Sequence, residues 1–171
     1  TFVFKIIEKI LSLKTNVFIT INNEDYNYAK FNLFRRVPCY KINGVGLDLS
    51  VGHFKKNIKK KKGIKKILVI AAYKKEKGYS EILKVAEVLK DQKMKIECYG
   101  YGDYYKYDTI KIKKKLNNIS FNNFDINLKN KIKNFDILLH LSKREGLPVS
   151  LMQSLSEGLP VICYNIRGNN D

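Results

Sequence analysis

The chain contains no tryptophan, only three prolines and only three cysteines among its 171 residues. The cysteines, Cys39, Cys98 and Cys163, are odd in number, far apart, and lack the spacing of a metal site. They argue against a disulfide scaffold and predict buried thiols in a reducing compartment. No apolar run approaches the roughly 20 residues of a membrane span, and no secretory signal is visible. These absences predict a cytoplasmic protein.

Acidic residues are also scarce. The chain has 33 lysines and arginines against 16 aspartates and glutamates, a formal net charge of +17. Such a charge raises affinity for anionic membranes, nucleic acids and phosphorylated ligands without choosing among them, and the excess of Lys, Asn and Ile is also typical of an AT-rich coding sequence. The densest run, residues 55–66, is too charged to pack and predicts a solvated linker. The alternative is attraction to an anionic inner membrane leaflet.

What the chain does have is an alternation of short apolar runs with helical patterns. An amphipathic helix is expected over residues 2–13 and another from the Asn22–Asp25 turn to about Asn32. Later helices are expected at residues 80–89 and 128–132, and a short or irregular one before Leu116. Strands are expected at residues 16–21, 36–42, 67–72, 94–99, 118–121, 137–141 and 161–164. This alternation predicts a Rossmann-like, doubly wound parallel α/β sheet.

The most informative stretch runs from Phe135 to Asp171 and predicts strand, loop, helix and strand. Pro148 suits a first helical position, Val149, Met152 and Leu155 recur at helical spacing, and Gly158 ends the helix. The loop lies beside the helix N-terminus, whose free N–H groups suit a phosphate. Glu145 in this loop could hold the hydroxyls of a sugar nucleotide, or it could merely cap the helix or face solvent.

A second strand, loop and helix, from Ile67 to Leu89, is again a unit that presents a phosphate site, and its loop contains Lys77 and Gly78. The alternative for Lys77 is an exposed loop lysine in a lysine-rich chain. Five tyrosines fall between Tyr99 and Tyr107, and they predict edge packing around a loop, with base stacking as the alternative.

The segment EGLPVSLMQ, in which Gln153 follows Glu145 by eight positions, resembles the donor-binding signature of retaining glycosyltransferases of the GT-B fold, the group 1 family. That signature has a second glutamate where this chain has Gln153. The tail NIRGNND and the N-terminal run TNVFITINNEDYNYAK are similar to the branch that builds bacterial capsule and exopolysaccharide.

The resemblance implies a set of site residues. Glu145 would be the catalytic residue at the donor sugar, Gln153 would lie at the ribose, and Lys77 at the donor diphosphate. Backbone N–H groups would bind the donor near Gly146, Leu147, Val149 and Ser150. An arginine of the family is replaced here by Ala72, with Lys74 or Lys75 as its substitute, although a lysine lacks the bidentate fork. No metal and no cofactor are expected, with the nucleoside-diphosphate sugar as substrate.

The resemblance also implies a domain organisation. Residues 1–54 would be the end of an N-terminal, acceptor-side domain and the interdomain crossing around Gly44-Val45-Gly46, with Asp48 and Phe54 behind it. Residues 55–66 would be a basic linker. Residues 67–171 would be most of a C-terminal nucleotide-sugar-binding domain, so the chain would be an internal piece of a two-domain enzyme.

The predicted function is that of a hexosyltransferase-type glycosyltransferase acting on a nucleoside-diphosphate sugar, UDP-linked, with retention. Its acceptor would be a glycan or lipid-linked precursor of a cell-surface polysaccharide, met by peripheral contact at the inner face of the plasma membrane. No specific nucleic acid partner is expected. Three alternatives stay open: a sugar-nucleotide epimerase or phosphorylase relative, an inactive or degenerate fragment, and a non-catalytic basic α/β module that binds polyanions.

Overall fold

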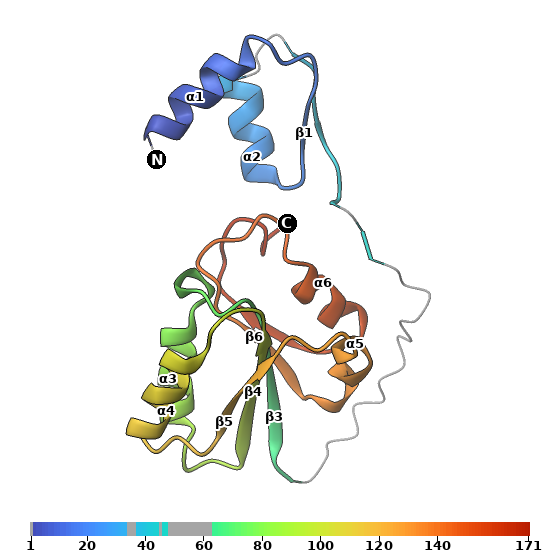
Figure 1. The fold of residues 1–171 in the computed structure, drawn as a ribbon. Coiled ribbons are helices and arrows are strands. Elements are labelled where there is room, and N and C mark those ends of the chain that lie inside the picture. Colours follow the sequence, from blue (N-terminus) through green and yellow to red (C-terminus); the bar gives the residue numbers. More distant parts are fainter. Residues whose placement is uncertain (1, 34–36, 45, 48–62) are drawn as a thin grey trace. The chain divides into compact units, whose positions relative to one another are not determined.

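A computed structural model describes residues 2–33, 37–44, 46–47 and 63–171 of the chain. These residues form two compact units (Figure 1). The first unit comprises Thr1–Gly46 together with two short later segments, Glu145–Leu147 and Ile166–Asp171. The second comprises Leu47–Arg144 and Pro148–Asn165. The stretch Phe135–Asp171, which contains most of the predicted site residues, is therefore divided between the two units.

The described residues of the first unit form two helices, a π-helical turn and two short strands. In chain order these are α1 (Phe2–Ser12), β1 (Phe18–Thr20), α2 (Asn23–Tyr28), η1 (Ala29–Leu33) and β2 (Cys39–Lys41). β1 and β2 pair in parallel, with Phe18 opposite Cys39 and Thr20 opposite Lys41. The elements predicted for this part of the chain are confirmed, with shorter strands than the sequence pattern suggested.

Helix α2 begins where turn chemistry predicts. Asn22 has an extended backbone, and its side-chain Oδ1 accepts a hydrogen bond of 2.8 Å from the backbone N–H of Asp25. Such a cap satisfies one of the N–H groups that a helix start leaves without an intrahelical partner. Glu24 and Asp25 in the first turn also complement the positive end of the helix dipole.

Helix α1 exposes the apolar side that its sequence pattern predicts. Ile6, Ile7, Ile10 and Leu11 are all exposed in the described structure. The resemblance assigns this helix to an N-terminal, acceptor-side domain, and that assignment stays a prediction.

The part of the second unit that the structure describes is a five-stranded sheet with helices. Its strands are β3 (Lys65–Ile70), β4 (Met94–Gly100), β5 (Ile119–Asn123), β6 (Ile137–His140) and β7 (Val161–Cys163). Its helices are α3 (Tyr79–Val88), α4 (Tyr105–Lys113), α5 (Leu128–Lys131) and α6 (Val149–Ser156), with 3-10 turns at Lys75–Lys77 and Ile132–Asn134.

The sheet has the order β5-β4-β3-β6-β7, and every pairing in it is parallel. The chain moves outward from β3 through β4 to β5, then returns to the other side of β3 for β6 and β7. Helices α3 and α4 cover one face, and α5 and α6 cover the other (Figure 1). This is the predicted doubly wound parallel α/β sheet.

The central strand β3 is buried on both faces. Ile67 and Val69 belong to the core under α3 and α4, whereas Leu68 packs on the opposite face with residues of β6 and α6. Strands of this kind read as continuous apolar runs because both sides of the pleat are covered. The run ILVI was therefore sufficient to predict this strand.

The tyrosines have two different roles. Tyr107 and Tyr104 pack with Tyr73, Tyr79 and Phe121 in an aromatic cluster of the α3 and α4 face. The predicted packing around a loop is thus confirmed for these two.

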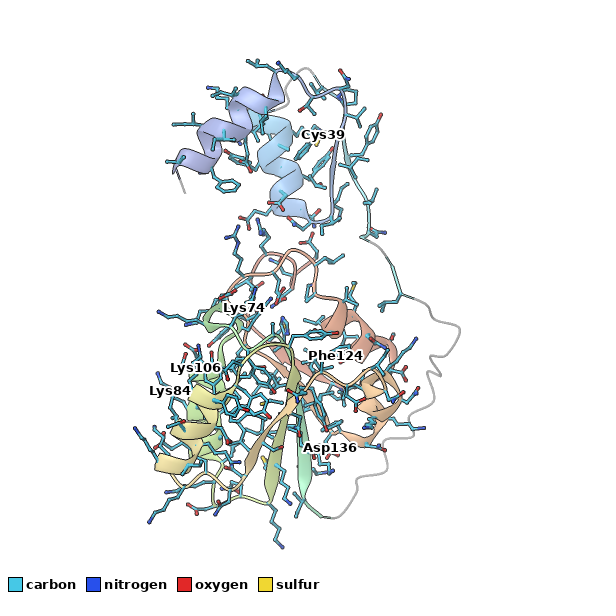
Figure 2. All side chains as sticks on the ribbon, in the orientation of Figure 1. Cys39, Lys74, Lys84, Lys106, Phe124 and Asp136 are labelled. Carbon is cyan, nitrogen blue, oxygen red and sulfur yellow. The ribbon has the colours of Figure 1, made fainter. Side chains whose placement is uncertain are left out.

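Tyr101 is different. It is 63% exposed and stacks on Phe124, which is 45% exposed, with ring centroids 4.1 Å apart and planes 15° apart. This pair follows the carboxyl ends of β4 and β5, and Figure 2 shows Phe124 among the side chains of that region.

Strand β3 begins two residues earlier than predicted. Lys65 and Lys66, assigned from their charge to the linker, pair with Met94 and Lys95 of β4. The Lys66 ammonium lies 3.1 Å from Glu97, and its backbone N–H donates to Asp136 at 2.9 Å. Charge did not exclude these residues from the strand because acidic neighbours offset it. Residues 55–62 lie outside the described residues, as do Val45, Asp48 and Phe54 of the predicted crossing.

The prediction of buried thiols is correct only for Cys98. Its side chain is fully covered, and burial raises the pKa of its thiol. Cys39 is half-buried and Cys163 is exposed. Cys163 is the last residue of β7, which pairs only with β6 in the described sheet. Its side chain is therefore less covered than a side chain on a central strand would be.

Candidate functional site

The order of the sheet changes direction between β3 and β6. The chain leaves β3 toward β4 on one side, and β6 later pairs with the other side of β3. Doubly wound sheets bind ligands beyond the carboxyl ends of the strands at such a switch point. Lys77 follows β3, and the segment Ser142–Arg144 follows β6. Figure 2 shows Lys74 near this end of the sheet, and Asp136, which precedes β6, lies toward the other end.

The loop after β3 is shaped by Gly78. Residues Lys75–Lys77 form a 3-10 turn, and Gly78 follows with φ +79°. A Cβ on Gly78 would overlap the carbonyl oxygen of Leu141 at the end of β6. Position 78 requires glycine for two reasons: its backbone has the left-handed conformation, and the Leu141 carbonyl approaches it too closely for any side chain. Lys77 is thereby placed, half-buried, one residue before the N-cap of α3.

The loop after β6 is attached to the loop after β3. The backbone N–H of Lys143 donates to the carbonyl oxygen of Glu76 at 2.8 Å. The hydroxyl of Ser142, which is 1% exposed, lies 3.4 Å from the same carbonyl and 3.2 Å from that of Arg144. The two loops at the switch point therefore hold each other in place through backbone contacts.

One cation of this region already has a carboxylate partner. The Lys143 ammonium lies 2.7 Å from Oε1 of Glu81 in the first turn of α3. Hydrogen bonds from Lys143 and then from Ser80 lower the pKa of Glu81 to about 2. Glu81 therefore offsets the charge of Lys143, and Lys77 is the cation that the resemblance assigns to a donor.

Helix α6 begins one residue later than predicted. Pro148 is its N-cap, with φ −78° and ψ 106°, and Val149 is the first helical residue. Because the backbone N–H of Leu151 already donates to the Pro148 carbonyl, the N–H groups of Val149 and Ser150 are the first-turn donors directed toward the helix start. Their position at the positive end of the dipole suits an anion.

The buried face of α6 also differs from the expected one. Val149 and Leu155 are exposed, whereas Leu151 and Ser154 are buried. Ser154 tolerates burial because its hydroxyl donates to the Ser150 carbonyl at 2.8 Å. Gln153 is half-buried on this helix. Gly158, with φ +69°, and the bond from Leu159 N–H to the Ser154 carbonyl end the helix as predicted.

Glu145, Gly146 and Leu147 belong to the first unit, and all three are half-buried. The backbone carbonyl of Glu145 accepts a hydrogen bond from Nε of Arg167 at 3.1 Å. The carbonyl of Gly146 accepts one from Nδ2 of Asn22 at 3.2 Å.

The predicted site residues therefore fall into two groups. Lys77, Val149, Ser150 and Gln153 lie in the second unit, and the other three lie in the first. The roles of all seven stay predictions. The sequence pattern predicts Asn22 only as part of the turn that begins α2. It indicates no function for Ser142 or Arg167, although the tail containing Arg167 contributed to the resemblance.

Within the described part of the chain, no group of three or more His, Cys, Asp or Glu side chains could hold a metal ion. The expectation that the reaction needs no metal stays a prediction.

None of the helices in the described ranges is both long enough and apolar enough to cross a membrane.

Comparison with known proteins defines first the fold and then the family. Among solved structures, TarM of S. aureus, crystallised as a mutant with Fondaparinux, alpha-GlcNAc-glycerol and UDP, matches with a TM-score of 0.75 and 21% identity over 95% of this chain and 32% of its own. Anabaena HepE in complex with UDP-glucose matches with a TM-score of 0.69 and 13% identity over 90% of this chain and 46% of its own. The parallel α/β sheet is that of the GT-B glycosyltransferases.

The family model described as "Glycosyl transferases group 1" matches residues 52–171. Because this match covers more than half of the sequence, the chain belongs to the group 1 glycosyltransferase family. A curated protein of Bacillus subtilis (strain 168), "Putative glycosyltransferase EpsD", is 26% identical over 180 residues, covering 96% of this chain. The chain spans about half the length of that relative, 47%.

Proposed function

We propose that the chain is the donor-binding part of a hexosyltransferase that moves a sugar from a UDP-linked donor to a cell-surface polysaccharide precursor, with retention. The observation that carries the proposal is the switch point between β3 and β6, where Lys77 lies on a loop held by the Ser142–Arg144 loop. Family membership makes a nucleotide sugar the expected ligand there. The structural relatives were solved with UDP and UDP-glucose, which favours uridine as the base.

The donor diphosphate is the group that this arrangement would bind. Lys77 supplies a positive charge, and the first-turn N–H groups of Val149 and Ser150 supply directed donors. When the bond between the sugar's anomeric carbon and the diphosphate oxygen breaks, negative charge grows on that oxygen. Donors held in place before the reaction stabilise this charge without reorganisation, so no metal is required of the site.

The sugar and the ribose are assigned to Glu145 and Gln153. The Glu145 carboxylate would accept hydrogen bonds from the donor sugar hydroxyls next to the reacting carbon. Gln153 can both donate to and accept from ribose hydroxyls, but it lacks the charge that strengthens such bonds. We assign the uracil to the exposed Tyr101–Phe124 pair, because aromatic faces bind bases by stacking.

The second candidate is a polyanion-binding module without transferase activity. It is favoured by the net charge of +17, by Ala72 at the position of the family's arginine and by Gln153 at that of its second acid. Its binding would fall steeply with salt and would show no preference for sugar nucleotides.

Calorimetric titration with UDP, UDP-sugars and GDP-sugars at low and moderate salt separates the two candidates. The decisive variant is Lys77→Ala with Glu145→Ala, which removes one charge of each sign and leaves the net charge at +17. A donor site predicts salt-resistant binding that the double variant loses. Lys84→Ala, an exposed lysine of α3 seen in Figure 2, is the matched control and should bind as the parent does. Equal binding of every polyanion, lost with salt and unchanged in the double variant, would overturn the proposal.

A further inference from the structure

The segment Glu145–Leu147 makes close contacts with two glycines of the first unit. Gly168, with φ +81°, approaches so closely that a Cβ there would overlap the carbonyl oxygen of Gly146. The side chain of Leu147 lies against Gly44, where a Cβ would overlap its Cδ2 atom. Gly168 thus admits the backbone of this segment and Gly44 admits the side chain of Leu147, because neither glycine has a side chain of its own.

Arg167 makes two contacts in different directions. Its Nε donates to the carbonyl oxygen of Glu145 at 3.1 Å, and its Nη1 lies 2.8 Å from Oδ1 of Asp25 in α2. A guanidinium can do both because its donors are fixed in one plane and point apart. The Asp25 carboxylate therefore orients the same side chain that holds Glu145.

Asn22 contacts the other oxygen of the Asp25 carboxylate. Its side chain is fully buried, its Oδ1 caps α2, and its Nδ2 donates to Oδ2 of Asp25 at 2.8 Å and to the Gly146 carbonyl at 3.2 Å. A buried amide with both N–H groups and its oxygen engaged is held in one orientation. Asn22, Asp25 and Arg167 thus form one polar network that ends on two successive backbone carbonyls.

We propose that Arg167 and Asn22 are positioning residues, which fix the backbone of Glu145 and Gly146 so that the Glu145 carboxylate is held in its reactive orientation. The proposal rests on the proposed function, because it assigns Glu145 to the donor sugar. Neither residue needs to touch the donor. Displacement of a reactive group by about 1 Å can cost roughly 100-fold in rate, so loss of the network should lower turnover more than donor affinity.

Three variants separate positioning from folding. Arg167→Met removes both contacts. Arg167→Lys keeps the charge but has one nitrogen in place of the separate Nε and Nη1 that reach Glu145 and Asp25. Asn22→Asp keeps an oxygen to cap α2 but removes the donor to Gly146 and places a second carboxylate beside Asp25. Lys114→Met is the matched control, since it also removes one cation from an ion pair, 2.6 Å from Glu87 on the surface of the second unit.

The experiment uses the intact protein that carries this chain and the UDP-sugar that binds best in calorimetry. Turnover is measured as UDP release with water as the acceptor. In this reaction the bond between the anomeric carbon and the diphosphate oxygen breaks. The anomeric carbon forms a new bond to the water oxygen, and the water loses a proton. We expect Arg167→Met and Asn22→Asp to lower kcat by roughly 10- to 100-fold while the Kd for UDP changes by less than about threefold. Arg167→Lys should resemble Arg167→Met, and Lys114→Met should resemble the parent.

The Glu145→Gln background gives the decisive readout. If Arg167 acts through Glu145, then Arg167→Met should cause little further loss of turnover in that background. An equal further loss, or full activity in Arg167→Lys, would overturn the proposal.

Amide hydrogen exchange gives an independent readout. The amides of residues 145–147 should exchange faster in Arg167→Met at unchanged global stability, and unchanged exchange would also count against positioning. Parent-like turnover of Glu145→Gln, or no binding of UDP by the parent, would instead refute the proposed function.

Discussion

At the scale of single residues, the clearest constraints are close backbone approaches. Gly78 admits the carbonyl of Leu141, Gly100 admits that of Ala71, and Gly168 admits that of Gly146. The first two lie at the carboxyl edge of the parallel sheet, where neighbouring strands end beside one another. The loops that would contact a donor are therefore held by contacts that any side chain at these positions would disrupt.

Gly78→Ala should destabilise the protein more than Gly102→Ala, although both residues have positive φ. Gly102 has only ordinary contacts at 3.8 Å, so it should lose roughly 1–2 kcal/mol from the left-handed conformation alone. Gly78 should lose a further ~1–3 kcal/mol by overlap with Leu141. Urea unfolding of both variants measures the difference, and equal losses would refute the role of the close approach.

The Glu81–Lys143 pair predicts a small pH dependence of stability. The folded-state pKa of Glu81, about 2, lies below its unfolded value, so the pair stabilises the protein above pH ~4.5 and this contribution is lost as the pH falls toward 2. Because the pair is partly exposed, its contribution should be only about 0.2–1 kcal/mol. Lys143→Met should therefore be less stable than the parent at pH 7 and nearly equal to it at pH 2.5, as measured by urea unfolding. A difference that persists at the lower pH would contradict this assignment.

At the scale of elements, the N-terminus of α6 is the feature whose function a backbone substitution can test. Pro148 is the N-cap with an extended backbone, so the next position tolerates proline. The helix would then survive a substitution that removes one N–H group. Side-chain variants alone could not test whether the helix start binds phosphate, because the proposed donors are backbone N–H groups.

Val149→Pro should weaken UDP binding by roughly 10-fold or more, since a hydrogen bond to a charged group contributes about 1.5–3 kcal/mol. Val149→Ala keeps the N–H group and is the matched control, with affinity close to the parent. Calorimetry gives the affinities, and circular dichroism verifies that the helix content of the two variants is the same. Parent-like affinity in Val149→Pro would exclude this N–H group as a phosphate donor.

At the scale of the whole molecule, the charge of +17 supports a proposal about location. A polysaccharide precursor carried on a lipid would be met at the inner face of the plasma membrane, where anionic lipids attract basic proteins. The same charge also admits binding to any polyanion, so membrane binding needs its own measurement.

We expect the protein to sediment with vesicles that contain anionic phosphatidylglycerol and not with vesicles of neutral phosphatidylcholine alone. Binding should fall as salt shortens the range of electrostatic attraction. A charge-reducing variant of the basic run, Lys59→Gln with Lys60→Gln and Lys61→Gln, tests whether residues 55–66 contribute. Equal sedimentation with both kinds of vesicle would contradict the peripheral, charge-driven contact.

Local patterns were sufficient to predict the strands and helices of both units, because hydrophobic periodicity and turn residues act over a few positions. They did not decide which face of α6 is buried, since Val149, Met152 and Leu155 are as regularly spaced as Leu151 and Ser154. They also misplaced the start of β3, because the acids that offset Lys65 and Lys66 are distant in sequence.

The sequence by itself determined the doubly wound α/β fold, the two loops at the carboxyl ends of β3 and β6, and the family that the signature around Glu145 indicates. Only the tertiary structure decided what holds that signature in place. Asn22 and Gly146 are 124 positions apart, and Asp25 and Arg167 are 142 apart. Contacts at such separations leave no periodic trace in the chain, because they depend on how complete elements pack and not on the order of neighbouring residues.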